Sequence, residues 1–211
     1  MYKVEQQELS ERVYRRIKEM ILKNQLVSGQ KLNQESLAQA LGVSRTPLLS
    51  AFAKLEKEYL IELIPRRGAF VKKLSREELK DLYDLRLRLE PLGAFDAATH
   101  ATPEALAELE KRFTEFQEAV AGQYPFLLQA DYDFHMAIMR MSGNVLLYRI
   151  ISSFNIIVIS NLSGLLKPAE QSLEEHRGIL QAIRQRDAPL ADRLMHEHLL
   201  DSRNRLDQKE L

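Results

Sequence analysis

The chain has 211 residues, of which 45% are apolar and 28% charged, and it contains no cysteine. This length suits two small domains, each with its own core. The absence of cysteine excludes disulfide bonds and thiolate metal sites, so any metal must be held by His, Asp or Glu. The chain has neither a leader-like N-terminus nor a run of about 18 apolar residues, and we therefore expect a cytoplasmic protein without membrane contact.

The formal charge is zero overall but unevenly distributed. Residues 1–74 have 14 Lys+Arg against 8 Asp+Glu, a net +6, whereas residues 75–211 have 16 against 22, a net −6. A basic half and an acidic half indicate different partners, and the basic half is the candidate for nucleic acid. The same two ranges are the predicted domains.

Three helices are predicted in the basic half. The first begins at Ser10, which can cap it, and ends near residue 24. Asn33 caps a short second helix, which Gly42 ends because glycine accepts a positive φ. Ser44 caps the third helix, so the second and third helices are joined by a tight turn.

A β-hairpin with a basic tip follows these helices. Residues 60–64 form a β-type run, a break follows, and residues 69–71 resume the run. Arg66, Arg67 and Gly68 lie at the tip, where the arginines can reach a phosphate or the minor groove. The order of helix, helix, tight turn, helix and hairpin predicts a winged helix-turn-helix DNA-binding domain.

The start of the third helix carries the groups that DNA recognition requires. Arg45 can reach a base edge, and the hydroxyls of Ser44 and Thr46 can bind phosphate at the positive end of the helix dipole. Pro47 lies in the first turn, where its missing N–H costs nothing. We therefore predict that these four residues contact double-stranded DNA.

These segments resemble the DNA-binding domain of the GntR family of regulators. The stretch L-N-Q-E-S-L-A-Q-A-L-G-V-S-R-T-P at 32–47 is similar to the family signature, and R-R-G-A-F-V at 66–71 is similar to its wing. The resemblance implies that the start of the third helix and the wing touch DNA. Leu49 replaces an arginine that the family has in this helix, which predicts a different or less stringent operator. Tyr59 stands where the family tends to have glycine.

The acidic half is predicted to be helical throughout. Ser75-Arg76-Glu77-Glu78 is a capping box that begins a helix of about 25 residues, in which we expect a kink at Pro91. Another helix begins at Thr102-Pro103. Four more are predicted at about 125–142, 145–165, 172–187 and 189–207, and a second capping box lies at 172–175. The fold class is therefore mainly α, a winged helix-turn-helix followed by an all-helical antiparallel bundle.

Three histidines and an aspartate lie on three of these helices. Asp131 and His135 are four positions apart and share a helix face, whereas His176 and His198 lie on later helices. A bundle can bring one face of each helix to a common interior point, and an N₃O donor set suits Zn²⁺ or Ni²⁺ first and Mn²⁺ next. Taken singly, each histidine is more often a core or surface residue than a ligand. Asp133 is a rival carboxylate on another helix face.

The order of short motifs in this half resembles the FCD domain, the ligand-binding domain of FadR-type regulators. The motifs are R-x-x-L-E-P at 86–91, D-x-x-F-H at 131–135, S-G-N at 142–144, E-H at 175–176 and A-x-x-x-M-x-x-H-L at 191–199. The resemblance implies that Asp131, His135, His176 and His198 hold a divalent metal, whose shell an organic acid often completes.

Two further residues are candidates for binding that acid. Arg86 resembles an arginine that faces the pocket in this family, where a guanidinium can pair with a ligand carboxylate. A surface ion pair with Glu90, four positions later, explains Arg86 equally well. Asn155 is a second candidate for lining the cavity, although packing at a helix seam is the stronger explanation for it.

Together these features predict a homodimeric transcription regulator, acting as a repressor or an activator. Two copies pair through the helical domains and place two recognition helices on a pseudo-palindromic operator, and a small acid at the metal alters their spacing. One alternative is a purely structural metal that ties three helices together. Another is a metal-dependent enzyme, but the chain has no H-E-x-x-H motif and that function leaves the basic half unexplained. We therefore expect no enzymatic activity.

Overall fold

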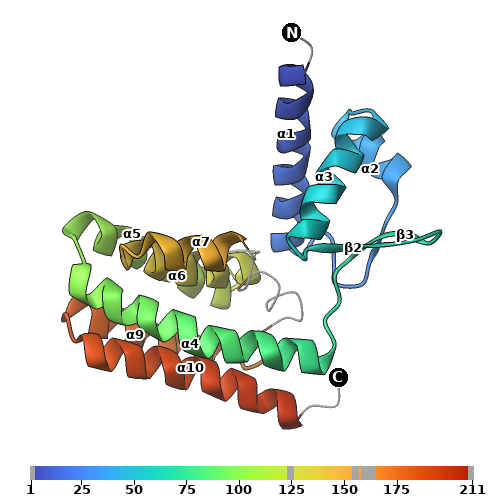
Figure 1. Cartoon of the computed structure of the whole chain (residues 1–211). Helices are drawn as coiled ribbons and strands as arrows, with labels where there is room; N and C mark the ends of the chain where they lie inside the picture. Colours follow the sequence, from blue (N-terminus) through green and yellow to red (C-terminus); the bar gives the residue numbers. More distant parts are fainter. Residues whose placement is uncertain (1–2, 123–125, 154–156, 158–164, 209–211) are drawn as a thin grey trace. The chain divides into compact units, whose positions relative to one another are not determined.

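The computed structural model describes residues 3–122, 126–153, 157 and 165–208. Its contacts divide the chain into two compact units, the N-terminal unit Met1–Lys73 and the helical unit Leu74–Leu211. Figure 1 shows the elements of both units. Among the described residues, no helix combines the length and the apolar character that a membrane span requires.

The N-terminal unit contains three helices and a small sheet. The helices are α1 (Lys3–Leu22), α2 (Gln34–Leu41) and α3 (Arg45–Lys57), and the strands are β1 (Lys31–Leu32), β2 (Ile61–Ile64) and β3 (Gly68–Val71). The sheet is antiparallel with the order β1-β3-β2, and the β2–β3 hairpin projects beyond the helices as a wing (Figure 1). This is the predicted winged helix-turn-helix, with β1 as an additional strand.

Local capping explains where α2 begins and ends. The Asn33 side chain accepts hydrogen bonds from the backbone N–H groups of Glu35 and Ser36, each at 3.0 Å, and Gly42 ends the helix at φ 64°. The prediction that Ser10 begins α1 is wrong, because α1 begins at Lys3. The residues before Ser10 are mostly good helix formers without a breaker, so nothing stops the helix there.

Burial of one face of α3 against α1 holds the third helix in place. Ile17 on α1 and Leu48, Phe52 and Leu55 on α3 have no exposed surface. Truncation of Phe52 to alanine would cost about 3–5 kcal/mol, the usual value for a buried aromatic ring. The opposite face of α3 is left for solvent.

The helical unit contains only helices in its described residues. They are α4 (Arg76–His100), α5 (Pro103–Val120), α6 (Leu127–Met141), α7 (Val145–Ser153), α9 (Ala169–Arg184) and α10 (Ala188–Gln208). The long helices α4 and α10 lie side by side, and α6 packs against both α4 and α5 (Figure 1). The mainly helical fold class predicted from the sequence is confirmed.

The two predicted capping boxes have different outcomes. At the start of α4, the Ser75 hydroxyl accepts from the Glu78 N–H at 3.1 Å, and the Glu78 carboxylate accepts from the Ser75 N–H at 2.8 Å. The second box is wrong, because α9 begins directly after Pro168 and Ser172 lies buried inside the helix. Proline has its φ fixed near the helical value, so the helix can start at once. Helix α4 continues through Pro91 to His100.

A glycine allows α6 to approach α4 closely. A Cβ atom at Gly93 of α4 would lie 2.3 Å from Cε of Met139 on α6. Met139 and its neighbour Ile138 have no exposed surface, so the methionine has little room to move aside. The close approach brings the polar residues of α6 within reach of the carboxylate and guanidinium of α4.

Candidate functional site

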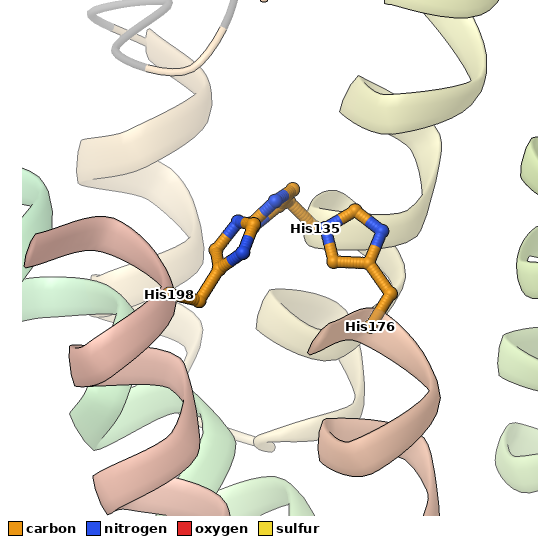
Figure 2. A group of neighbouring side chains, drawn as sticks. All are labelled: His135, His176 and His198. Atoms are coloured by element: carbon orange, nitrogen blue, oxygen red, sulfur yellow. The ribbon is translucent and has the colours of Figure 1, made fainter. Parts of the chain in front are cut away.

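Three histidine rings converge in the interior of the helical unit. His135 comes from α6, His176 from α9 and His198 from α10, and Figure 2 shows their rings gathered around one point. One ring nitrogen of each lies within 4.8 Å of the other two. His135 and His176 are fully buried and His198 is 5% exposed. Three helices thus contribute one imidazole each to a single buried cluster.

Asp131 lies next to this cluster, one turn before His135 on α6. Its Oδ1 atom is 3.8 Å from Nε2 of His176 and 4.0 Å from Nε2 of His135. The residue is only 4% exposed. The rival carboxylate of Asp133 instead accepts a hydrogen bond from Nε2 of Gln129 at 2.9 Å. The aspartate beside the histidines is therefore the one that the sequence spacing favoured.

Glu90 of α4 supports His135 from behind. Its Oε2 atom lies 2.6 Å from Nδ1 of His135, and its Oε1 atom accepts from Nε of Arg86 at 2.5 Å. Burial raises the pKa of the Glu90 carboxyl, but the opposing effect of Arg86 and His135 is larger and lowers this pKa to about 2. An ionised Glu90 holds the proton of His135 on Nδ1, which leaves Nε2 as a lone-pair donor toward the cluster.

Glu175 of α9 supports His198 in the same way. Its Oε2 atom lies 2.7 Å from Nδ1 of His198. Lys167 contacts the same carboxylate, and Gln171 donates to its Oε1 atom at 2.9 Å. A carboxylate behind an imidazole is the usual second partner of a metal-ligating histidine. His198 is therefore also oriented with Nε2 toward the cluster.

Several ring nitrogens of the cluster have no hydrogen-bond partner in the described part of the structure. These are Nε2 of His135 and both nitrogens of His176, all inaccessible to solvent. A buried polar atom without a partner costs about 1–3 kcal/mol. A cation at their centre would satisfy Nε2 of His135 and one nitrogen of His176, since metal–nitrogen bonds of about 2.1 Å place ligand atoms about 3.4 Å apart. Shifts of about 1 Å bring atoms within 4.8 Å to that spacing.

The electrostatics keep His176 and His198 neutral. Burial lowers the pKa of His176 well below 6.5, and the neighbouring His198 and His135 lower it further. Burial also lowers the pKa of His198, and the Lys167 ammonium adds to the effect. A neutral imidazole is the form that binds a metal ion. The donor set therefore fits a divalent cation. Three imidazole nitrogens and the Asp131 oxygen supply the four ligands that tetrahedral zinc requires.

A cavity of about 10 Å³ adjoins the cluster. Arg86 lines it and is buried at 2% exposure while it pairs with Glu90. The surface ion pair considered from the sequence is thus a buried one, and the same guanidinium faces the cavity. Asn155, the other predicted effector contact, lies outside the described residues. The remaining lining residues are Tyr83, Asp131, His135, Leu165, Leu166, Lys167, Ser172, His198, Leu199 and Ser202.

The start of α3 presents most of its predicted DNA contacts to solvent. Ser44, Arg45 and Thr46 are exposed, and the Ser44 hydroxyl makes no capping hydrogen bond to the helix. Pro47 is buried, so it packs the start of the helix into the unit and is not expected to touch a groove. Leu49, one turn after Arg45, is 48% exposed on the same face.

The tip of the wing is basic and exposed. Arg66 and Arg67 form the turn between β2 and β3, and the Arg67 guanidinium lies 5.9 Å from the centre of the Phe70 ring. Gly68 has φ 108°, a value that favours glycine, and Arg66 has φ 64°. The turn therefore leaves two exposed cations at the tip of the wing, where a DNA backbone can meet them.

Comparison with known proteins identifies the architecture. The profile of the bacterial regulatory proteins of the gntR family matches residues 9–71, and that of the FCD domain matches residues 81–201. The chain belongs to the GntR family and carries an FCD domain. The predicted FadR-like combination of the two domains is thereby confirmed.

Similar members of the GntR family are transcription regulators. The HTH-type regulator YdhC of Bacillus subtilis is 27% identical over 88% of this chain and 85% of its own length. The HTH-type transcriptional repressor RspR of Escherichia coli is 26% identical over 92% and 86%. The E. coli McbR/YncC structure has a TM-score of 0.79 at 23% identity and covers 95% of this chain and 97% of that one, which shows the fold alone.

This GntR protein is therefore a DNA-binding transcription regulator, in line with the expectation that it is not an enzyme. Glu90, Glu175 and Lys167 support the site, but none of them was assigned a site role from the sequence. Glu90 carried a signal, since it lies four positions after Arg86 in the R-x-x-L-E-P motif. Lys167 carried none, because it precedes a proline in a connection where a charged residue is ordinarily solvated.

Proposed function

We propose that this regulator senses a small organic carboxylate at a divalent metal ion held by Asp131, His135, His176 and His198. The observation that carries the proposal is the group of buried imidazole nitrogens without partners, which adjoins a cavity with an arginine in its wall. Zinc or nickel suits the three nitrogens and one oxygen best, and manganese is the next choice. When bound, the ion supplies a Lewis-acidic anchor for an anionic ligand.

Residues around that ion would have two roles, which are to orient the ligating histidines and to bind the acid. Glu90 and Glu175 fix the ring orientations of His135 and His198 through their Nδ1 atoms. Arg86 lies where its guanidinium can meet a ligand carboxylate. Because Arg86 and Glu90 are on α4 while the ligands are on α6, α9 and α10, a bound acid would couple four helices of the unit.

Regulation further requires two DNA-binding heads, which we propose are supplied by a homodimer. Leu85, Leu92 and Phe95 on α4 are 53%, 44% and 39% exposed, and their spacing places them on one helix face. An exposed apolar stripe of this kind is typical of an interface. Pairing of two copies places two α3 helices on a pseudo-palindromic operator. By analogy with the relative named a repressor, repression is the proposed sign.

A mobility-shift titration with DNA from the region next to the regulator's own gene tests this function. Metal-loaded protein is expected to shift the DNA, and a carboxylate is expected to change the midpoint only when the metal is present. The acid must bind two conformations unequally to have this effect. Metal retention together with operator binding that no carboxylate alters would instead identify a structural metal.

A further inference from the structure

Lys167 adds a second buried cation to the cavity beside the histidines. Its side chain is 2% exposed, and its Nζ atom contacts the Glu175 carboxylate. The same atom donates to the backbone oxygen of His198 at 2.7 Å. The lysine lines the cavity together with Arg86. A buried lysine is uncommon in proteins, so its charge has to be included in any account of what the cavity can hold.

The fixed charges around the cavity can be counted. Arg86 and Lys167 supply two positive charges, and Asp131, Glu90 and Glu175 supply three negative ones, which leaves one negative charge in excess. Residues 154–164 contain no ionisable side chain and therefore add nothing to this count.

One more carboxylate approaches the lysine. Asp201 lies 3.6 Å from Nζ of Lys167, but it also pairs with Nε of Arg205 at 3.0 Å, so these two partly exposed residues cancel. The excess of one negative charge therefore stands. Four of the five side chains that make it up are buried, and Glu175 is 26% exposed. A divalent ion would change the excess to one positive charge, and an uncompensated charge in a buried site is costly. The complementary ligand carries a single negative charge.

The size and the walls of the cavity point in the same direction. The volume of about 10 Å³ is the space that one water molecule needs, so any carboxylate requires the walls to open, and the smallest carboxylates require the least opening. Leu165, Leu166 and Leu199 form an apolar part of the wall. A short alkyl group can lie against these leucines, whereas a second carboxylate there would lose its hydration without a partner.

We propose that the effector is a small monoanion, a short aliphatic monocarboxylate, and that Lys167 sets this selectivity by balancing the pocket charge. The inference rests on the metal site of the proposed function. It differs from that proposal by naming the charge and size of the ligand and by assigning a role to a residue outside the metal shell.

Calorimetric titration of the metal-loaded, full-length protein tests the inference. The ligands are acetate and propionate on one side and succinate and glutarate on the other, with metal content measured by native mass spectrometry before and after. We expect the monocarboxylates to bind at least tenfold more tightly, and the metal-free protein to bind none. Tighter binding of the dicarboxylates would overturn the inference.

Variants of the lysine separate its charge from its packing. Lys167→Met is expected to keep the metal and lose at least tenfold in acetate affinity, and Lys167→Arg is expected to restore most of it. Lys80→Met, which removes a surface partner of Asp207, serves as the matched control and should leave acetate affinity unchanged. Acetate affinity equal to wild type in Lys167→Met would contradict the role of the lysine. Should this variant fail to fold, the ligand series on the wild-type protein decides the inference alone.

The same measurements distinguish the two proposals. A wild-type protein that holds no metal refutes the metal site and with it the proposed function. A protein that holds its metal and prefers succinate refutes only the monoanion inference and leaves the metal-dependent sensor intact.

Discussion

Substitution of Glu90 by glutamine tests how Glu90 orients His135 in the histidine cluster. Both Glu90 and Arg86 are buried, at 0% and 2% exposure, and Oε1 of Glu90 lies 2.5 Å from Nε of Arg86. Glu90→Gln keeps the shape of the side chain but leaves the Arg86 charge without its counter-ion. Breaking a buried ion pair in this way typically costs about 3–5 kcal/mol, because the remaining charge stays desolvated.

The same substitution weakens the orientation of His135. The carboxylate that lies 2.6 Å from Nδ1 becomes an amide, which can present either an oxygen or an N–H to the ring. Loss of a carboxylate behind a ligating histidine typically lowers metal affinity about 10–100-fold. Glu90→Gln should therefore reduce both the stability of the metal-free protein and its affinity for the metal.

Urea unfolding of the metal-free protein and a competitive chelator titration measure these two quantities. Asp84→Asn on the same helix is the matched control, since Asp84 forms a surface pair with Arg203 and should change neither quantity. Equal unfolding midpoints and equal metal affinities for Glu90→Gln and the wild type would refute the assigned role of Glu90.

Four further outcomes are expected. Because the pKa values of His176 and His198 in the folded chain lie well below 6.5, the unfolded chain binds more protons below that pH. Unfolding experiments on the metal-free protein should therefore show full stability above pH 6.5 and a loss of up to about 1.4 kcal/mol per histidine per pH unit below it. Arg45→Ala should weaken operator binding by about 1–3 kcal/mol in mobility shifts. Leu49→Arg should tighten binding and steepen its salt dependence by about one phosphate contact, as measured by anisotropy at several salt concentrations. Tyr59 is 58% exposed and has φ 58°, a value that glycine adopts without strain. Tyr59→Gly should therefore raise the free energy of unfolding by about 1 kcal/mol, and an unchanged melting temperature would contradict this.

Local signals were the part of the fold that the sequence could predict. Asn33, Gly42 and Ser75 act where their chemistry indicated, because a cap depends only on residues within one turn. Ser10 and Ser172 carry the same chemistry but lie inside helices. A capping residue permits a helix to begin and does not force it to, so helix-forming residues on its N-terminal side override it. The two-residue strand β1 was not predicted, since it is too short to show alternation.

In the site, too, local relations between residues could be predicted from the sequence and long-range ones could not. Asp131 and His135 share a face by spacing alone, but nothing local relates them to His176 or His198, and their grouping depended on the family resemblance. Glu90 acts on His135 across 45 positions of sequence, a relation that exists only once α4 packs against α6. Long-range contacts of this kind are fixed by the packing of the helices and leave no periodic pattern in the chain.

Native mass spectrometry of wild-type protein and His176→Phe, both prepared with excess zinc or nickel, shows whether the buried histidines bind a metal ion. The His176 ring stacks on Phe134 with centroids 4.3 Å apart, so phenylalanine should preserve the packing while it removes both ring nitrogens. If the three imidazoles hold one cation, the wild-type protein carries one divalent ion per protomer and the variant carries none. A wild-type protein without metal, or a variant that retains the ion, would contradict this prediction.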